Sequence, residues 1–177
     1  MTGGGQGFAL KTLYLLRHAK AGESAQGDAA RPLVKKGRKA AKAMGAYLAT
    51  LEPAAELILC STAARTRETL EVMLPELPPP HAVLFEQELY LAEPEVLLAR
   101  LRAVPPATAA VLLIGHNPGL HELGARLAAE PGRLAEGFPT AALAAFELPG
   151  WAELRWHKAK LSRFETPKDL NRDFDAD

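Results

Sequence analysis

Short apolar runs alternate with amphipathic segments along most of the chain. Four runs have the length of buried strands, and they cover residues 10–16, 57–60, 83–85 and 111–114. Segments with apolar residues at helical spacing follow these runs and predict helices over residues 34–51, 64–74, 94–103 and 118–129. This alternation predicts an α/β fold in three α/β/α layers, with helices covering both faces of a mostly parallel central sheet.

The two ends of the chain carry weaker patterns. Residues 143–148 and 153–157 predict two further strands, and Pro149 and Gly150 between them favour a hairpin. Residues 1–7 are rich in glycine and predict a flexible leader, whereas residues 163–177 predict an irregular tail. Because no repeat or break in composition marks a second domain, we expect a single domain over residues 8–162.

Composition narrows the class of protein. The 177 residues are 48% apolar and 24% charged, which is typical of a globular domain and not of a disordered chain or a fibre. The 21 basic and 21 acidic residues balance, which argues against a nucleic-acid binder. The single cysteine excludes an internal disulfide and a multi-cysteine zinc site. With no signal or membrane segment visible, we expect a cytoplasmic monomer that does not bind membranes.

Basic and polar residues follow three of the predicted strands at the points where they end. They are Arg17 and His18 after the run at residues 10–16, Ser61 and Arg65 after the run at 57–60, and Gly115, His116 and Asn117 after the run at 111–114. Ligands of open α/β sheets bind beyond this edge. Two arginines and two histidines there suit a phosphate group, since guanidinium groups match phosphate oxygens and a histidine can attack phosphorus.

The helix predicted over residues 118–129 adds to this expectation. Asn117 is a suitable cap for it, and Pro118 suits its first turn. Main-chain N–H groups would then also face the bound anion.

Four short motifs give the chain a resemblance to the histidine phosphatase superfamily, which includes phosphoglycerate mutases. The segment Leu15-Leu16-Arg17-His18-Ala19 resembles its Arg-His-Gly signature. Residues 61–69 (STAARTRET) and 115–117 (GHN) are similar to its second arginine and second histidine motifs. Residues 28–33 (DAARPL), followed by Gly37, look more specifically like SixA-type phosphohistidine phosphatases.

The resemblance implies a fold, a site and a mechanism. The fold is that of phosphoglycerate mutase without a cap domain. His18 attacks phosphorus and becomes a transient phosphohistidine, while Arg17, Arg65 and His116 hold the phosphoryl oxygens. No cofactor or metal is needed. The substrate is a phosphorylated protein, such as a histidine phosphotransfer domain, or a small phosphoester. The substrate-binding residues would be Asp28, Arg31 and Asn117.

Some residues depart from the pattern or leave alternatives open. Ala19 replaces the usual glycine, and Val34 stands where a capping Ser or Thr often precedes the first helix. Glu88 is the best-placed general acid by its order in the chain, with Asp28 as the alternative. Three functions stay open: a protein phosphohistidine phosphatase, a small-molecule phosphomonoesterase, and a phosphate-binding protein without turnover.

Three other features allow a second interpretation. Cys60 ends a strand, but the spacing to Arg65 does not fit a cysteine-based phosphatase, so we interpret it as a buried small side chain. His121 and Glu122 do not form a metal-binding pattern. The basic run over residues 31–42 predicts either a solvated helix face or a positive rim that attracts an acidic phosphoprotein.

Overall fold

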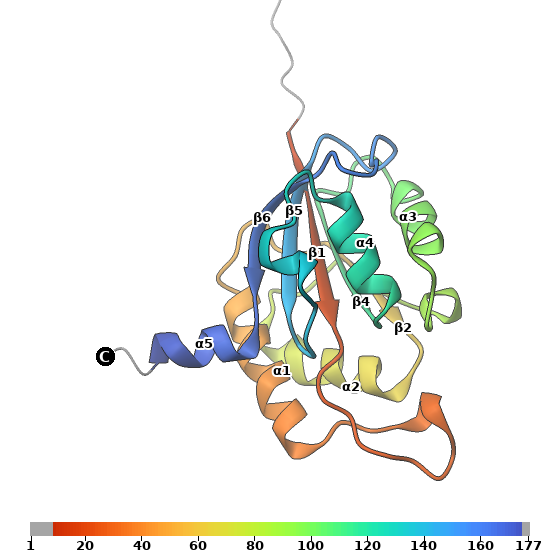
Figure 1. Ribbon diagram of the computed structural model, residues 1–177, viewed down its shortest axis with the longest axis vertical. Coiled ribbons are helices and arrows are strands. Elements are labelled where there is room, and N and C mark those ends of the chain that lie inside the picture. The colour runs from red at the N-terminus through yellow and green to blue at the C-terminus, as the bar shows by residue number, and fades with distance from the viewer. Residues whose placement is uncertain (1–8, 175–177) are drawn as a thin grey trace, which may run out of the picture.

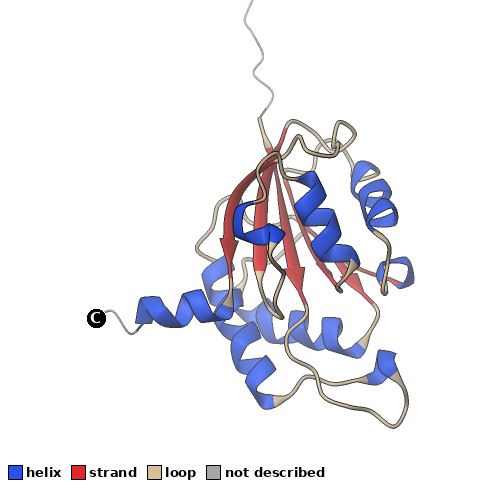
Figure 2. Cartoon of the chain, in the orientation of Figure 1, coloured by secondary structure: helices blue, strands red, loops and turns tan. Residues whose placement is uncertain are grey.

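The computed structural model describes residues 9–174, which form a sheet with helices on both faces (Figures 1 and 2). The strands are β1 (Lys11–Arg17), β2 (Leu57–Ser61), β3 (Ala82–Glu86), β4 (Ala110–Gly115), β5 (Leu143–Leu148) and β6 (Lys160–Glu165). They lie in the order β3-β2-β4-β1-β5-β6. Only β5 runs antiparallel to its neighbours among the described strands, so the mostly parallel sheet is confirmed.

Five α-helices lie in the described part of the chain and cover the sheet in two groups. They are α1 (Lys35–Leu48), α2 (Ala64–Met73), α3 (Pro94–Arg102), α4 (Gly119–Leu127) and α5 (Pro167–Phe174). Helices α3 and α4 pack together on one face, and α1 packs with α2 and α5 on the other (Figure 1). No helix in residues 9–174 is long and apolar enough to span a membrane.

The central strand β1 shows how the sequence pattern produces the layers. Side chains alternate across a strand, so Leu13 and Leu15 enter the core beside α3 and α4. Tyr14 and Leu16 enter the core beside α1 and α2. All four are at most 2% exposed, which explains why a strand buried on both faces has a continuous apolar run.

The predictions for the C-terminal part were partly wrong. Residues 153–157 form turns and not a strand, so there is no tight hairpin at Pro149 and Gly150. Trp151 instead buries its ring in this long connection and donates its indole N–H to the Thr108 carbonyl oxygen at 2.8 Å. The chain then re-enters the sheet as β6 and continues into α5, so the tail predicted to be irregular is regular through residue 174. The predicted leader lies outside the described residues.

Candidate functional site

The pairing of β1 with β4 brings the two histidines together. Arg17 and Gly115 are register partners at the carboxyl ends of these parallel strands. His18 and His116 are the next residues, and the His18 main-chain N–H donates to the Gly115 carbonyl oxygen at 3.2 Å. Their ring centroids lie 5.3 Å apart. Adjacent strands therefore deliver both imidazoles to one point at the edge of the sheet.

The ring of His18 is held in one tautomer. Its Nδ1 lies 2.7 Å from the carbonyl oxygen of Ala19, and a carbonyl only accepts, so Nδ1 carries the proton. Burial, with the nearby arginines, lowers the pKa of His18 to about 4. The ring is therefore neutral near pH 7, and its Nε2 has a free lone pair. This is the form that a nucleophile requires.

Arg65 reaches the same point from the first turn of α2. Its residue is only 3% exposed, although it carries a charge. Nη1 donates to the Asp28 carbonyl oxygen at 2.8 Å, and Nη2 donates to Asp28 Oδ2 at 3.0 Å. Residue 28 belongs to a short 3₁₀ turn, Asp28–Ala30, in the loop that follows β1. The loop between β1 and α1 therefore holds the buried guanidinium group of Arg65 in one orientation.

Three buried nitrogen atoms in this region have no hydrogen-bond partner among the described residues. They are Nε of Arg17, Nε of Arg65 and Nδ1 of His116. Arg17 uses its Nη1 on the Phe138 carbonyl oxygen at 3.1 Å, and His116 Nε2 bonds with Ser61 Oγ at 2.7 Å. Unpaired buried polar groups are costly, so they mark a place built for a ligand that supplies acceptors. A phosphoryl group has three such oxygens.

Burial also affects the second histidine. The protein interior, together with Arg65, lowers the pKa of His116 to about 3. A dianionic phosphoryl group would oppose this effect and favour the protonated ring, which donates from both nitrogens.

These side chains line one open pocket of about 330 Å³. Its lining residues are Arg17, His18, Lys20, Ala21, Asp28, Arg31, Arg65, Leu91, His116, Asn117 and Thr140. Every residue that the sequence indicated for catalysis or substrate binding is in this set except Glu88. The side chain of Glu88 is exposed in a neighbouring 3₁₀ turn, Gln87–Leu89. Of the two candidate acids, the pocket therefore contains only Asp28.

Asn117 lies in the site, but not as the predicted helix cap. Helix α4 begins at Gly119 with Pro118 as its N-cap residue, and no side chain caps it. Asn117 donates instead through Nδ2 to the Phe138 carbonyl oxygen at 2.9 Å, the same oxygen that Arg17 uses. The side chain thus ties the β4–α4 loop to the loop before β5. The missing cap expected at Val34 is confirmed, since no side chain caps α1 either.

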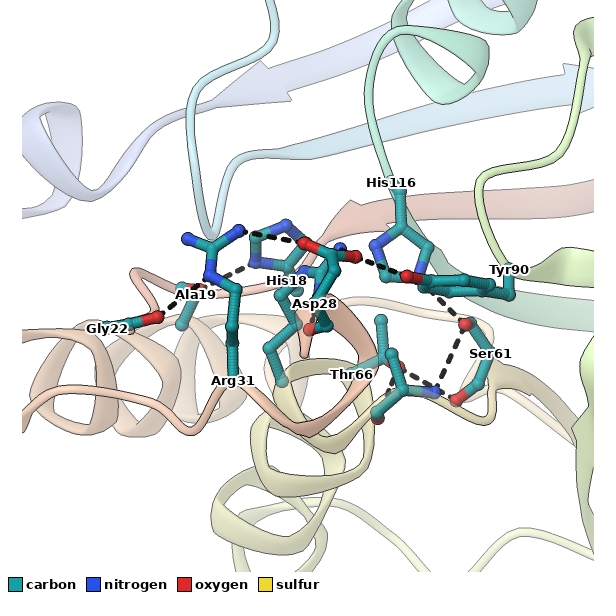
Figure 3. A network of polar contacts seen from close by, with 11 residues as sticks. His18, Ala19, Gly22, Asp28, Arg31, Ser61, Thr66, Tyr90 and His116 are labelled. Atoms are coloured by element: carbon teal, nitrogen blue, oxygen red, sulfur yellow. Dashed lines mark hydrogen bonds and ion pairs between the residues drawn. The ribbon is translucent and has the colours of Figure 1, made fainter. Parts of the chain in front are cut away.

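Tyr90 is the functional candidate that the sequence reasoning missed. Its hydroxyl donates to Asp28 Oδ2 (Figure 3). Its ring meets that of His116 edge-on with the centroids 5.4 Å apart, and the guanidinium carbon of Arg65 lies 5.9 Å from its centroid. The available signal was its position after β3, at the same edge of the sheet as the other site residues. Leu91, the next residue, lines the pocket at a positive φ of 49°.

The alternative interpretations can be placed as well. Cys60 is fully buried, and burial raises the pKa of its thiol to about 12, so it is not a thiolate nucleophile. His121 bonds to the Leu134 carbonyl oxygen at 2.7 Å. No group of three metal-ligating side chains lies together among residues 9–171, whose side chains the structure describes. Arg38 in the basic run pairs with Glu68 at 2.6 Å, while Lys35, Lys36, Lys39 and Lys42 are exposed.

Comparison with known proteins agrees with this geometry. A sequence model of the histidine phosphatase superfamily, branch 1, matches residues 13–89. Uncharacterized protein Rv1276c of Mycobacterium tuberculosis is 32% identical over 162 residues, which cover 86% of this chain and 100% of that protein.

Solved structures give the same result over nearly the whole chain. A protein assigned as phosphohistidine phosphatase SixA from Nakamurella multipartitia matches with a TM-score of 0.80 and 33% identity, over 90% of this chain and 97% of the other. The protein histidine phosphatase SixA complexed with tungstate matches with a TM-score of 0.77 and 26% identity, over 90% and 99%.

Proposed function

Because the chain belongs to the histidine phosphatase superfamily, we propose that it is a phosphatase that uses His18 as its nucleophile. One observation carries the proposal. The free Nε2 of His18 lies in a pocket with five other basic side chains, three of which, Arg17, Arg65 and His116, each keep a buried nitrogen without a partner in the described chain. A nucleophile and a set of unused donors are what phosphoryl transfer needs.

The reaction would proceed in two steps. In the first, the lone pair of His18 Nε2 forms a bond to phosphorus, and the bond from phosphorus to the leaving group breaks with its electron pair. Arg17, Arg65 and His116 stabilise the charge on the three phosphoryl oxygens. In the second, water attacks phosphorus, the P–N bond breaks and its electron pair returns to Nε2. Inorganic phosphate leaves with the protons of the water.

The substrate that we propose is phosphohistidine on a protein, for example on a phosphotransfer domain. SixA proteins are similar to this chain along nearly its whole length, and no cap domain stands over the pocket in the described part of the molecule. An open pocket leaves room for a side chain that projects from a protein surface. A small phosphomonoester is the second candidate, and a phosphate-binding protein without turnover is the third.

The test compares phosphate release and phosphoenzyme formation in the wild type and His18→Ala, with EDTA present. A phosphohistidine-bearing protein domain is the first substrate, and a panel of sugar phosphates is the second. We expect acid-labile labelling and turnover of the first substrate only, both lost in the variant. The matched control is His81→Ala. His81 is exposed and directly precedes the amino end of β3, at the edge of the sheet opposite the pocket. A folded His18→Ala protein that keeps turnover would contradict the assignment.

The other outcomes separate the candidate functions. Turnover of sugar phosphates alone would favour the small-molecule phosphatase. Binding of inorganic phosphate without any phosphoenzyme would favour the protein without turnover.

A further inference from the structure

We propose that Asp28 binds the leaving group of the substrate. Its carboxylate would accept a hydrogen bond from the ring N–H of a phosphohistidine as the P–N bond breaks. The inference rests on the proposed function and adds to it a residue that acts on the departing imidazole and not on the phosphoryl group.

The carboxylate of Asp28 is fixed by donors from three separate segments. Arg31, on the same loop, donates from Nη1 to Oδ1 at 3.2 Å. Arg65, on α2, donates from Nη2 to Oδ2 at 3.0 Å. Tyr90, after β3, donates its hydroxyl to Oδ2 (Figure 3). A carboxylate has about four acceptor positions, so three donors hold it in place and leave room for one more.

The position of Asp28 places it on the leaving-group side of the pocket. His18 is buried, whereas the side chain of Asp28 is 45% exposed, so Asp28 lies nearer the mouth. In phosphoryl transfer the attacking and leaving atoms lie roughly in line on opposite sides of phosphorus. When the buried His18 attacks from within, the leaving group points outward, toward the mouth and Asp28.

The donors around Asp28 decide what it can do there. Hydrogen bonds from Tyr90, Arg65 and Arg31 hold its pKa well below the usual range of a carboxyl group. It is therefore ionised at neutral pH and has no proton to give. The same ionised state makes it a strong acceptor for an N–H group. We infer that Asp28 is not the general acid that its acidic side chain suggested.

Phosphohistidine chemistry balances without a proton donor. The substrate ring carries a proton on the nitrogen distant from phosphorus when it is in its imidazolium form. As His18 Nε2 bonds to phosphorus, the P–N bond of the substrate breaks and its electron pair stays on the ring nitrogen. The product is neutral histidine that keeps its N–H, and an ionised Asp28 at that N–H stabilises the reactive imidazolium.

An alkyl phosphate ester differs at this point. Its leaving oxygen becomes an alkoxide and needs a proton, and an ionised carboxylate nearby opposes the growing negative charge. The position of Asp28 therefore favours a nitrogen leaving group over an alkoxide.

The experiment measures kcat/KM of Asp28→Asn on two probes, free phosphohistidine and p-nitrophenyl phosphate. Nitrophenolate is a stable anion, and it leaves without a proton and offers no N–H. We expect the variant to lose at least about tenfold more activity on phosphohistidine than on the phenyl ester, the size expected of a hydrogen bond to a charged group. Asp28→Glu, which keeps a carboxylate, should recover part of the loss.

Two further variants separate the role on the leaving group from a structural one. Tyr90→Phe keeps the Asp28 carboxylate but removes one of its three donors. Like Asp28→Asn, it should lose more kcat/KM on phosphohistidine than on the phenyl ester, but the loss should be smaller. Asp169→Asn removes a carboxylate that pairs with Arg133 at 2.9 Å, outside the pocket, and should change neither rate. Melting temperatures of all variants check that each is folded.

The outcomes distinguish this inference from the proposed function. If Asp28→Asn loses both activities equally while the wild type hydrolyses phosphohistidine, the inference is overturned and the function stands. If the wild type hydrolyses the phenyl ester but neither free phosphohistidine nor a phosphohistidine-bearing protein domain, both the substrate and the role of Asp28 are overturned.

Discussion

The main-chain N–H of Ala19 donates to the hydroxyl oxygen of Thr69 at 3.0 Å and so joins the loop after His18 to α2. The hydroxyl of Thr69 in turn donates to the Arg65 carbonyl oxygen at 2.6 Å, so the hydrogen bonds extend from Ala19 to the main chain of Arg65. The carbonyl of Ala19 is the group that orients His18. Ala19 is therefore held on both sides, by the imidazole of the proposed nucleophile His18 and by the helix that carries the buried Arg65.

Thr69→Val should weaken both the fold and the reaction. Valine has nearly the shape of threonine but cannot accept the Ala19 N–H, and residue 69 is fully buried. A buried donor left without a partner costs about 1–3 kcal/mol in the free energy of unfolding, which urea denaturation measures. We also expect a lower kcat, because the orientation of His18 loosens. Thr50→Val, at an exposed helix end, is the control and should stay within about 0.5 kcal/mol of the wild type.

Arg65→Lys should lower kcat substantially, although the substitution keeps the positive charge. Lysine keeps the charge, but it cannot donate to both the carbonyl oxygen and Oδ2 of Asp28 and still direct a further N–H into the pocket. We expect both Arg65→Lys and Arg65→Ala to lower kcat, with a loss of about 10²–10³ for alanine, as for a removed oxyanion donor. Arg67→Lys is the control, because Arg67 lies outside the pocket lining and its Nε donates to the Thr62 carbonyl oxygen. A loss below tenfold for Arg65→Ala would place Arg65 outside the transition state.

The sequence predicted those site residues that directly follow a buried strand. Arg17, His18 and His116 follow apolar runs buried on both faces, so their common edge follows from parallel pairing alone. Tyr90 follows the edge strand β3, whose exposed positions weaken the pattern, and only the long loop that carries Asp28 gives its hydroxyl a partner. Such contacts between distant loops have no local signal.

The strand β6 was missed for a related physical reason. It is an edge strand with exposed and charged positions, so no continuous apolar run marks it. The apolar residues that misled the prediction, Leu154 and Trp156, pack instead on the core beneath a loop. Burial by tertiary structure, and not strand formation, explains their hydrophobic character.

The stability of the protein should fall steeply as the pH drops from about 6.5 toward 4. The folded state lowers the pKa of His18 to about 4 and that of His116 to about 3. In this window the unfolded chain therefore binds protons that the folded protein does not, so the free energy of unfolding decreases with falling pH. The slope from each histidine is at most about 1.4 kcal/mol per pH unit.

Urea denaturation at several pH values checks this expectation. His18→Gln should reduce the slope, whereas His81→Gln, at an exposed position, should not. Added inorganic phosphate should raise the melting temperature, because it binds only the folded pocket. Equal slopes in the wild type and His18→Gln would contradict a depressed pKa at His18.

Gly37→Ala should destabilise the protein, although alanine normally favours a helix by up to about 1 kcal/mol over glycine. Gly37 lies in the first turn of α1, and a Cβ atom there would come within 2.2 Å of the Lys20 carbonyl oxygen. That oxygen already accepts the Val34 N–H at 3.0 Å, and Lys20 itself lines the pocket. The helix and the loop must separate to admit the methyl group, at a cost of about 1–3 kcal/mol.

The loop that would move begins two residues after His18, so kcat should fall together with stability. Gly137→Ala provides the matched control, because a Cβ atom at Gly137 meets no atom within 4 Å. It should leave kcat unchanged and stability unchanged or slightly higher. If Gly37→Ala were as stable and active as this control, the close approach of α1 to the loop would not constrain the site.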